Sequence, residues 1–242
     1  MPVRLWLKRQ GRAVQRKLIH FDRVTDWSVL RRLQPYRPEF GGRRGKYIDR
    51  FYIEQFLATY QNDIHGYVAE MESPQYTRLF GAGRVERSEV LDIHEGNTAR
   101  TMTIDLALTN LAPENLFDCV ICTQTIFLIR DYGDAIRTLY KILKPQGTLL
   151  VTVPGISPTV PASLVAGAGD DWWRFTARSA LHVFGRVFGD DRVAVHSYGN
   201  VLTTTAFLHG LVQEELTREE LEYNDPNYEL IIGIKATKPL AA

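Results

Sequence analysis

Residues 139–154 read Leu-Tyr-Lys-Ile-Leu-Lys-Pro-Gln-Gly-Thr-Leu-Leu-Val-Thr-Val-Pro. The apolar spacing that leads into this stretch predicts an amphipathic helix over 134–143, and the apolar run at its end predicts a strand over 148–153. Lys144 to Gly147 separate the two, because proline cannot continue a helix and glycine favours the turn that follows one. A helix followed at once by an apolar strand is typical of a parallel α/β sheet.

The same alternation continues on both sides. Further helices are predicted at 47–60, after the capping residue Thr176, and at 201–212. The seven predicted strands are 67–70, 85–90, 102–106, 117–123, 148–153, 193–197 and 229–236. This order predicts an α/β fold: a doubly wound, mostly parallel seven-stranded sheet with helices on both faces.

Length and composition indicate a soluble globular protein. The chain has 242 residues, of which 45% are hydrophobic and 24% charged, so one domain with an accessory segment is expected. No run approaches the roughly 18 apolar residues that span a bilayer. The basic N-terminus lacks the apolar core of a secretory signal, so we expect a cytoplasmic protein.

Charge is distributed unevenly along the chain. Residues 1–50 contain 14 lysines and arginines against 4 acidic residues, whereas the remainder contains 15 against 24. We therefore predict a basic N-terminal helical extension and linker over 1–46, with a helix near 4–21, and a catalytic domain over 47–242. Contact of residues 4–21 with a membrane surface is one interpretation, and a solvated basic face is the other. Binding to nucleic acid is not favoured. The sequence leaves the oligomeric state open.

Cys119 and Cys122 form an isolated C-x-x-C pair within a predicted strand. Residues three apart on a strand point to opposite faces, so we expect two buried thiols rather than a redox pair. One pair cannot complete a four-ligand zinc site, and no other metal-ligand spacing is present.

Ligands of open α/β sheets bind beyond the carboxyl ends of the strands. The residues at those positions are 70–76, 92–94, 105–106, 123–126 and 154–157, and they are mostly acidic and polar. Such a cluster suits a ligand with hydroxyls and a cationic centre. It does not suit a dinucleotide, because no G-x-G-x-x-G opens the first helix.

Three stretches carry a family resemblance: Phe-Asp-Cys-Val-Ile-Cys-Thr-Gln-Thr at 117–125, residues 139–154, and Asp-Trp-Trp-Arg-Phe-Thr at 171–176. Through them the chain, from Asp49 to about Lys238, resembles bacterial class I S-adenosylmethionine-dependent methyltransferases, especially those encoded beside glycan and natural-product genes. The resemblance implies a Rossmann-like methyltransferase fold and S-adenosyl-L-methionine as cofactor.

The resemblance also implies roles for individual residues. Glu70 would begin the cofactor loop, Asp92 would bind the ribose hydroxyls, and Asp105 and Leu106 would border the adenine. Gln124 and Thr125 would lie beside the reactive methyl group. Asp171, Trp173 and Arg174 would face the methyl acceptor. Each has a structural alternative: a turn residue at Asp92, a strand-end cap at Asp105, core packing of Trp173, and a surface ion pair between Arg174 and Asp171.

One position departs from the family pattern. Where the family has glycine, two residues after the acidic position, this chain has Glu72. Glycine there allows a positive φ and a close approach of the backbone to the cofactor. Glu72 either contacts the cofactor's amino group along a different loop path or weakens cofactor binding.

The predicted activity is O-methylation of a small-molecule or sugar hydroxyl by direct in-line transfer. His209 and Asp171 are the predicted general bases, because both fall in the acceptor-side half of the chain. The alternative is a non-catalytic methyltransferase-like binding or scaffold protein that has lost cofactor binding at Glu72.

Overall fold

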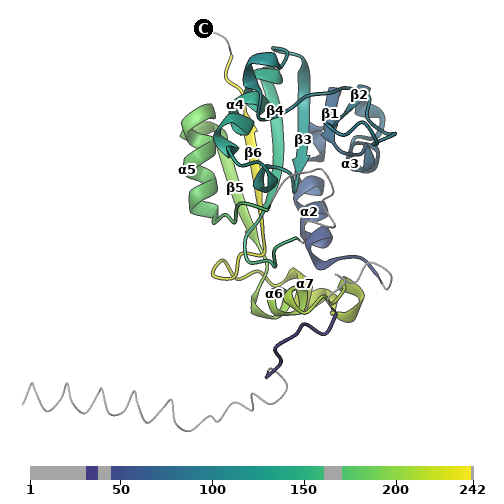
Figure 1. Cartoon of the computed structure of the whole chain (residues 1–242), viewed down its shortest axis with the longest axis vertical. Helices are drawn as coiled ribbons and strands as arrows, with labels where there is room; N and C mark the ends of the chain where they lie inside the picture. Colours follow the sequence, from purple (N-terminus) through teal and green to yellow (C-terminus); the bar gives the residue numbers. More distant parts are fainter. Residues whose placement is uncertain (1–30, 38–44, 161–170, 241–242) are drawn as a thin grey trace, which may run out of the picture. The chain divides into compact units, whose positions relative to one another are not determined.

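The computed structural model describes residues 31–37, 45–160 and 171–240 (Figure 1). The chain divides into two compact units, Met1–Pro35 and Tyr36–Ala242. The predicted basic helix at 4–21 lies outside the described residues. The second unit contains the sheet and every predicted site residue.

The centre of this unit is one six-stranded sheet. Its strands are β1 (Gly66–Met71), β2 (Val85–Leu91), β3 (Phe117–Thr123), β4 (Leu143–Pro154), β5 (Val193–Tyr198) and β6 (Ile231–Thr237). Their spatial order is β2-β1-β3-β4-β6-β5. The first four are mutually parallel, whereas β6 runs antiparallel to both β4 and β5. The mostly parallel sheet is therefore confirmed.

The predicted strand at 102–106 is wrong, so six strands rather than seven are found among the described residues. Met102 makes a single parallel bridge to Leu91. Beyond it the Asp105 carboxylate accepts a hydrogen bond from the Ala107 N–H at 2.8 Å. This local side-chain bond turns the chain away from β2, as aspartate often does in competition with a strand ladder.

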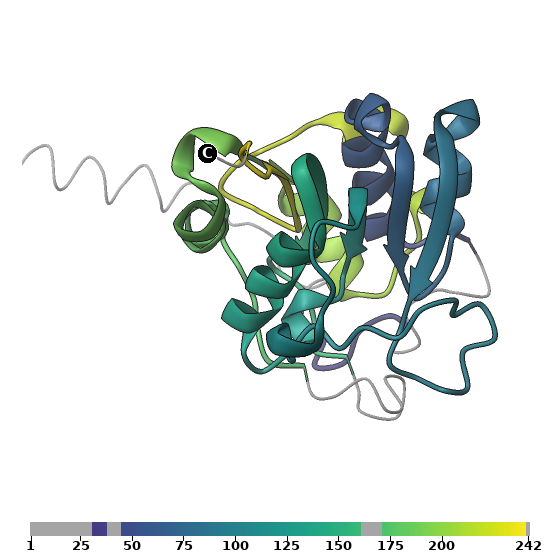
Figure 2. The same cartoon turned by 90° about the horizontal axis from the view of Figure 1, so that it is seen from above.

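Six helices of five or more residues accompany the sheet in the described part of the chain: α2 (Ile48–Thr59), α3 (Gln75–Phe80), α4 (Tyr132–Ile142), α5 (Ala177–Phe188), α6 (Val201–Leu208) and α7 (Arg218–Glu222). Figure 2 shows that helices cover both sides of the sheet. The predicted helix at 201–212 ends early, because Gly210 takes a positive φ of 72°.

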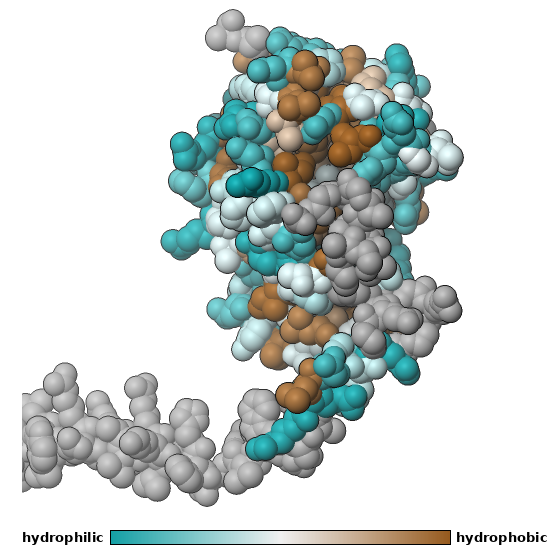
Figure 3. All heavy atoms as spheres, viewed as in Figure 1, coloured by the Kyte–Doolittle hydropathy of each residue, from teal (hydrophilic) through white to brown (hydrophobic). Residues whose placement is uncertain are grey.

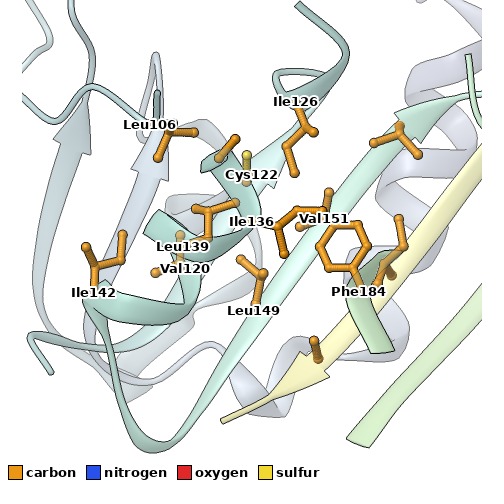
Figure 4. Close-up of a cluster of buried hydrophobic side chains, with 14 of the residues drawn as sticks. Leu106, Val120, Cys122, Ile126, Ile136, Leu139, Ile142, Leu149, Val151 and Phe184 are labelled. Atoms are coloured by element: carbon orange, nitrogen blue, oxygen red, sulfur yellow. The ribbon is translucent and has the colours of Figure 1, made fainter. Parts of the chain in front are cut away.

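Each face of the sheet has its own hydrophobic core. Val120, Leu149 and Val151 face α4 and α5 (Figure 4). Ile121 and Leu150, their neighbours in sequence, face α2 and α6 instead. This alternation follows the two-residue period of a strand and accounts for strands that are apolar on both sides.

The two cysteines follow the same alternation. Cys119 packs in the core on the α2 side and Cys122 in the core on the α4 side. Both thiols are free and buried, and burial raises the pKa of Cys122 to about 12. The prediction of two diverging buried thiols is confirmed.

The surface carries mixed polar and apolar side chains on the face shown in Figure 3. None of the helices in the described ranges is long and apolar enough to cross a membrane.

Candidate functional site

The carboxyl ends of β1, β2 and β3 meet at one edge of the sheet because the three strands are parallel. A cavity of about 80 Å³ lies there, and five predicted cofactor residues line it: Glu72, Asp92, Asp105, Leu106 and Thr125. Apolar side chains complete the lining, among them Ile93, Ile104 and Leu128. Residues from four separate loops thus converge on one place.

Glu70 does not line this cavity. Its buried carboxylate accepts hydrogen bonds from the backbone N–H groups of Tyr76 at 2.9 Å and Thr77 at 2.7 Å, in the first turn of α3. Burial raises the pKa of Glu70, and the two N–H donors oppose that rise. Glu70 therefore fixes the loop that follows β1 rather than reaching into the cavity.

Glu72 has the backbone conformation that the family's glycine would provide. Its φ is 65°, in the left-handed region. Its N–H donates to the Leu91 carbonyl at 3.0 Å, and its own carbonyl accepts from Asn97 Nδ2 at 2.7 Å. Burial, and next the charge of Asp92, raise the pKa of Glu72. The turn is kept, and a second carboxylate lines the cavity.

Asp92 follows β2 in a tight turn and is almost fully buried. One carboxylate oxygen accepts from the His94 N–H at 2.9 Å and the other from Asn97 Nδ2 at 2.6 Å. Burial acts to raise its pKa, but these hydrogen bonds hold the pKa of Asp92 below its usual value. A carboxylate offers about four acceptor positions, so an ionised Asp92 can still accept two ligand hydroxyls.

A second cavity of about 340 Å³ lies on the other side of the turn at 124–125. Gln124, Phe127 and Arg174 line it, together with Asp49 and Arg50 from the first turn of α2. Gln124 has a φ of 50°, and its N–H donates to the Thr152 carbonyl at 2.9 Å. This strained turn presents Gln124 to the second cavity and Thr125 to the first.

Asp171 and Arg174 form a tight pair beside the second cavity. Both carboxylate oxygens of Asp171 accept from the guanidinium, and one also accepts from the Val160 N–H at 2.8 Å. Burial acts to raise the pKa of Asp171, but these donors hold it below the usual value. Asp171 is therefore placed to orient Arg174 toward the cavity.

Trp173 lines a different hollow. Its indole N–H lies 3.1 Å from the carbonyls of Ile129 and Arg130, and its ring packs edge-on against Tyr132. The groove it borders, between α4 and α5, has a volume of about 990 Å³. The Trp173 side chain therefore borders a different hollow from the second cavity, which Arg174 lines.

His209 lies at the end of α6, where its ring packs against Tyr36 with centroids 4.9 Å apart. Its Nδ1 is buried and has no hydrogen-bond partner among the described residues. It does not line either of the two cavities at the strand ends.

Asp49 and Arg50 are site residues that the sequence patterns do not indicate. The helix that precedes the first strand runs back along the sheet, so it begins where the strands end. A position in the first turn of that helix is the sequence signal that could have indicated these two residues. Within the described residues, no group of three or more His, Cys, Asp or Glu side chains is arranged to hold a metal ion.

Comparisons with known proteins bear on the fold and on the class of domain. Residues 81–151 match the family model of the methyltransferase domain. Two solved structures share the fold. The first is an S-adenosylmethionine-dependent methyltransferase from Mesorhizobium loti, with a TM-score of 0.51 and 15% identity; the match covers 79% of this chain and 98% of that one. The second is an S-adenosylmethionine-dependent methyltransferase from Archaeoglobus fulgidus, with a TM-score of 0.50 and 14% identity; the match covers 78% of this chain and 94% of that one. Residues 81–151 thus match the methyltransferase domain, and the chain shares the fold of these S-adenosylmethionine-dependent methyltransferases.

Curated relatives match over shorter segments. The probable polyketide synthase 10 of Dictyostelium discoideum is 32% identical over 59 residues, or 24% of this chain. The probable polyketide synthase 5 of the same organism is 31% identical over 77 residues, or 31% of this chain. The matched segments span only 2–3% of the length of those relatives.

Proposed function

We propose that the protein transfers a methyl group from S-adenosylmethionine to a hydroxyl of a small molecule or sugar. The observation that carries the proposal is the convergence of Glu72, Asp92, Asp105, Leu106 and Thr125 on one cavity at the strand ends. The methyltransferase-domain match begins just after α3 and ends within β4, and it includes all of these residues except Glu72.

The side chains fit the parts of this cofactor. Asp92 is an ionised acceptor for the ribose hydroxyls, and Ile104 and Leu106 give an apolar wall for the adenine. The carboxylates of Glu72 and Asp105 favour a positively charged ligand, as the sulfonium is. A structure with the same fold, the phosphoethanolamine N-methyltransferase 2 of Haemonchus contortus (TM-score 0.50, 13% identity, coverage of 77% of this chain and 52% of that one), was solved with S-adenosyl-L-methionine bound.

Size supports a division of roles between the two cavities. The first, at about 80 Å³, is smaller than the roughly 300–1,000 Å³ of typical small-molecule sites. The second, at about 340 Å³, falls within that range and adjoins the first across Gln124 and Thr125. We expect the nucleoside to widen the first cavity and the acceptor to occupy the second. The matches to probable polyketide synthases favour a natural-product hydroxyl over a sugar.

Titration with S-adenosylhomocysteine by calorimetry and thermal unfolding tests the proposal. A ligand at a hundredfold its Kd adds about 2.7 kcal/mol to the free energy of unfolding. We expect saturable binding that Asp92→Ala weakens at least tenfold. Asp191→Ala is the matched control, because Asp191 is exposed ahead of β5, at the opposite edge of the sheet.

The absence of binding at millimolar S-adenosylhomocysteine would instead favour the non-catalytic scaffold. In that case Glu72, in place of the family's glycine, would be the substitution that abolished cofactor binding. The left-handed backbone at Glu72 supports the enzyme, since it keeps the turn that glycine makes.

A further inference from the structure

The second cavity contains a carboxylate whose surroundings differ from those of Glu70, Asp92 and Asp171. Asp49 lies in the first turn of α2 and keeps partial exposure where it lines the cavity. Its Oδ1 is buried and has no hydrogen-bond partner among the described residues. By contrast, both oxygens of each of the other three accept hydrogen bonds.

We infer that Asp49 is the general base that accepts the proton from the acceptor hydroxyl. The inference rests on the proposed function and names a catalytic residue for it. In the transfer, the acceptor oxygen would form a bond to the methyl carbon as the bond from that carbon to the sulfonium sulfur breaks, which would leave neutral S-adenosylhomocysteine. A neutral hydroxyl must therefore lose one proton to become a neutral methyl ether. That proton passes to the Asp49 carboxylate, which becomes a carboxylic acid and later releases it to solvent.

The chemistry of the surroundings favours this role. An unpaired carboxylate oxygen out of contact with water disfavours the charged form. Burial accordingly raises the pKa of Asp49; the neighbouring guanidinium of Arg50 and the backbone N–H groups of Arg50 and Asp49 oppose the rise without cancelling it. A base works best when its pKa approaches the working pH. Asp171, held ionised by Arg174, has little tendency to take a proton.

The groups that face Asp49 come from several elements. Arg50 is its neighbour on α2, and Tyr76 of α3 interacts with both. Arg174 and Tyr47 line the same cavity.

The remaining walls are apolar or neutral. Phe127 follows β3, Phe207 comes from α6 and Ile231 from β6, while Gln124 contributes a neutral amide. Among the described residues that line this cavity, Asp49 therefore supplies the carboxylate that an acceptor hydroxyl would meet. Arg174 borders the cavity as a fixed positive charge, because its N–H groups already donate to Asp171 and to the carbonyls of Ser157, Pro158 and Trp173.

Urea unfolding of Asp49→Asn tests the state of the carboxylate without any turnover. The variant replaces a poorly solvated charge by a neutral group of the same shape. We expect a higher midpoint urea concentration than for the wild type at pH 7. Because the folded pKa of Asp49 is raised, the difference shrinks as pH falls through that folded value and is lost below the unfolded pKa of about 3.9. Asp191→Asn should not move the midpoint. A lower midpoint for Asp49→Asn at pH 7 would show a stabilising ionised carboxylate at a helix N-terminus and would overturn the inference.

Binding and turnover complete the test. Asp49→Asn should bind S-adenosylhomocysteine within about threefold of the wild type; a tenfold loss would place Asp49 on the cofactor and overturn the inference. If the wild type itself does not bind, the proposed function fails, whereas the unfolding comparison still reports on the carboxylate. With catechol and methyl glucoside as acceptors, the variant should transfer methyl groups about 10²–10⁴-fold more slowly and lose the rise of rate with pH. An unchanged rate would equally exclude Asp49 as the base.

Discussion

Glu72 combines a left-handed backbone with a carboxylate that faces Asp92. Left-handed φ values cost a residue with a side chain about 1–2 kcal/mol. Because the Glu72 N–H donates to Leu91 at the end of β2 and its carbonyl accepts from Asn97 in the loop that follows, the turn persists despite that cost. The strain is therefore local, and it can be separated from the charge by two substitutions.

Glu72→Ala removes the carboxylate and keeps the strain, whereas Glu72→Gly removes both. We expect Glu72→Gly to be more stable than Glu72→Ala by about 1 kcal/mol. Glycine adopts the positive φ without strain, and this gain outweighs the larger conformational entropy that glycine gives the unfolded chain. Urea unfolding of the two variants measures the difference. Equal stabilities would mean that the position is not held left-handed.

Asp171 provides a test of the ion pair beside the second cavity. Asp171→Asn should lower the free energy of unfolding by about 1.5–3 kcal/mol at pH 7, the range for hydrogen bonds to charged groups. The pKa of Asp171 is lowered in the folded state, so its stabilisation is present above the unfolded value of about 3.9 and is lost as pH falls through the folded value. Unfolding is measured at pH 7 and at a pH of about 2.5, well below the unfolded pKa. The difference in free energy of unfolding between wild type and variant should shrink at the lower pH, and a pH-independent difference would contradict the ion pair.

Among the elements, those with strong periodicity could be predicted. The strand at 117–123 and the helix at 134–143 form close to their predicted bounds, because each buries a face that its own pattern defines. The strand predicted at 148–153 also forms, but β4 starts at Leu143 and includes residues 144–147, so the predicted break between helix and strand is wrong. Thr176 caps α5 as expected, accepting a hydrogen bond from the Ser179 N–H. The segment 102–106 could not be judged in this way, because the Asp105 side chain accepts a hydrogen bond from the Ala107 N–H and turns the chain. The apolar pattern does not show that local bond.

The start of α6 and the end of α7 depend on Asn200. Its Oδ1 caps α6 by accepting from the Thr203 N–H, and its Nδ2 donates to the carbonyls of Glu220 and Tyr223 at 2.8 and 2.7 Å. The side chain is almost fully buried.

Asn200→Ala should therefore cost more than an ordinary cap. A cap alone is worth about 1 kcal/mol, and the two unsatisfied carbonyls add about 1–3 kcal/mol. We expect a total loss of about 2–4 kcal/mol in urea unfolding, against about 1 kcal/mol for Thr176→Ala, which removes a cap at a more exposed position. Equal losses would show that Asn200 acts as a cap only.

For the molecule as a whole, the sequence predicts the part of the site that depends on strand order. Residues directly after parallel strands meet at one edge, and so Asp92 and Thr125 come together as expected. Asp105 lines the same cavity from the turn that follows the single bridge at Met102. The sequence does not reveal which carboxylates are already occupied by protein donors, as Glu70 and Asp171 are. Nor does it show that the start of α2 reaches the same edge and brings its first-turn carboxylate with it.

Amide hydrogen exchange with S-adenosylhomocysteine locates the site on the whole molecule. At short exchange times, amides report local opening, which a ligand suppresses only where it makes contact. We expect added protection at 72–76, 92–97, 105–108 and 124–130, the loops around the first cavity. Exchange in α5 and β5 should not change, because neither element borders that cavity. Protection concentrated instead along α4 and α5, beside the groove of about 990 Å³, would move the cofactor site to the opposite side of Trp173 and contradict the assignment of Asp92.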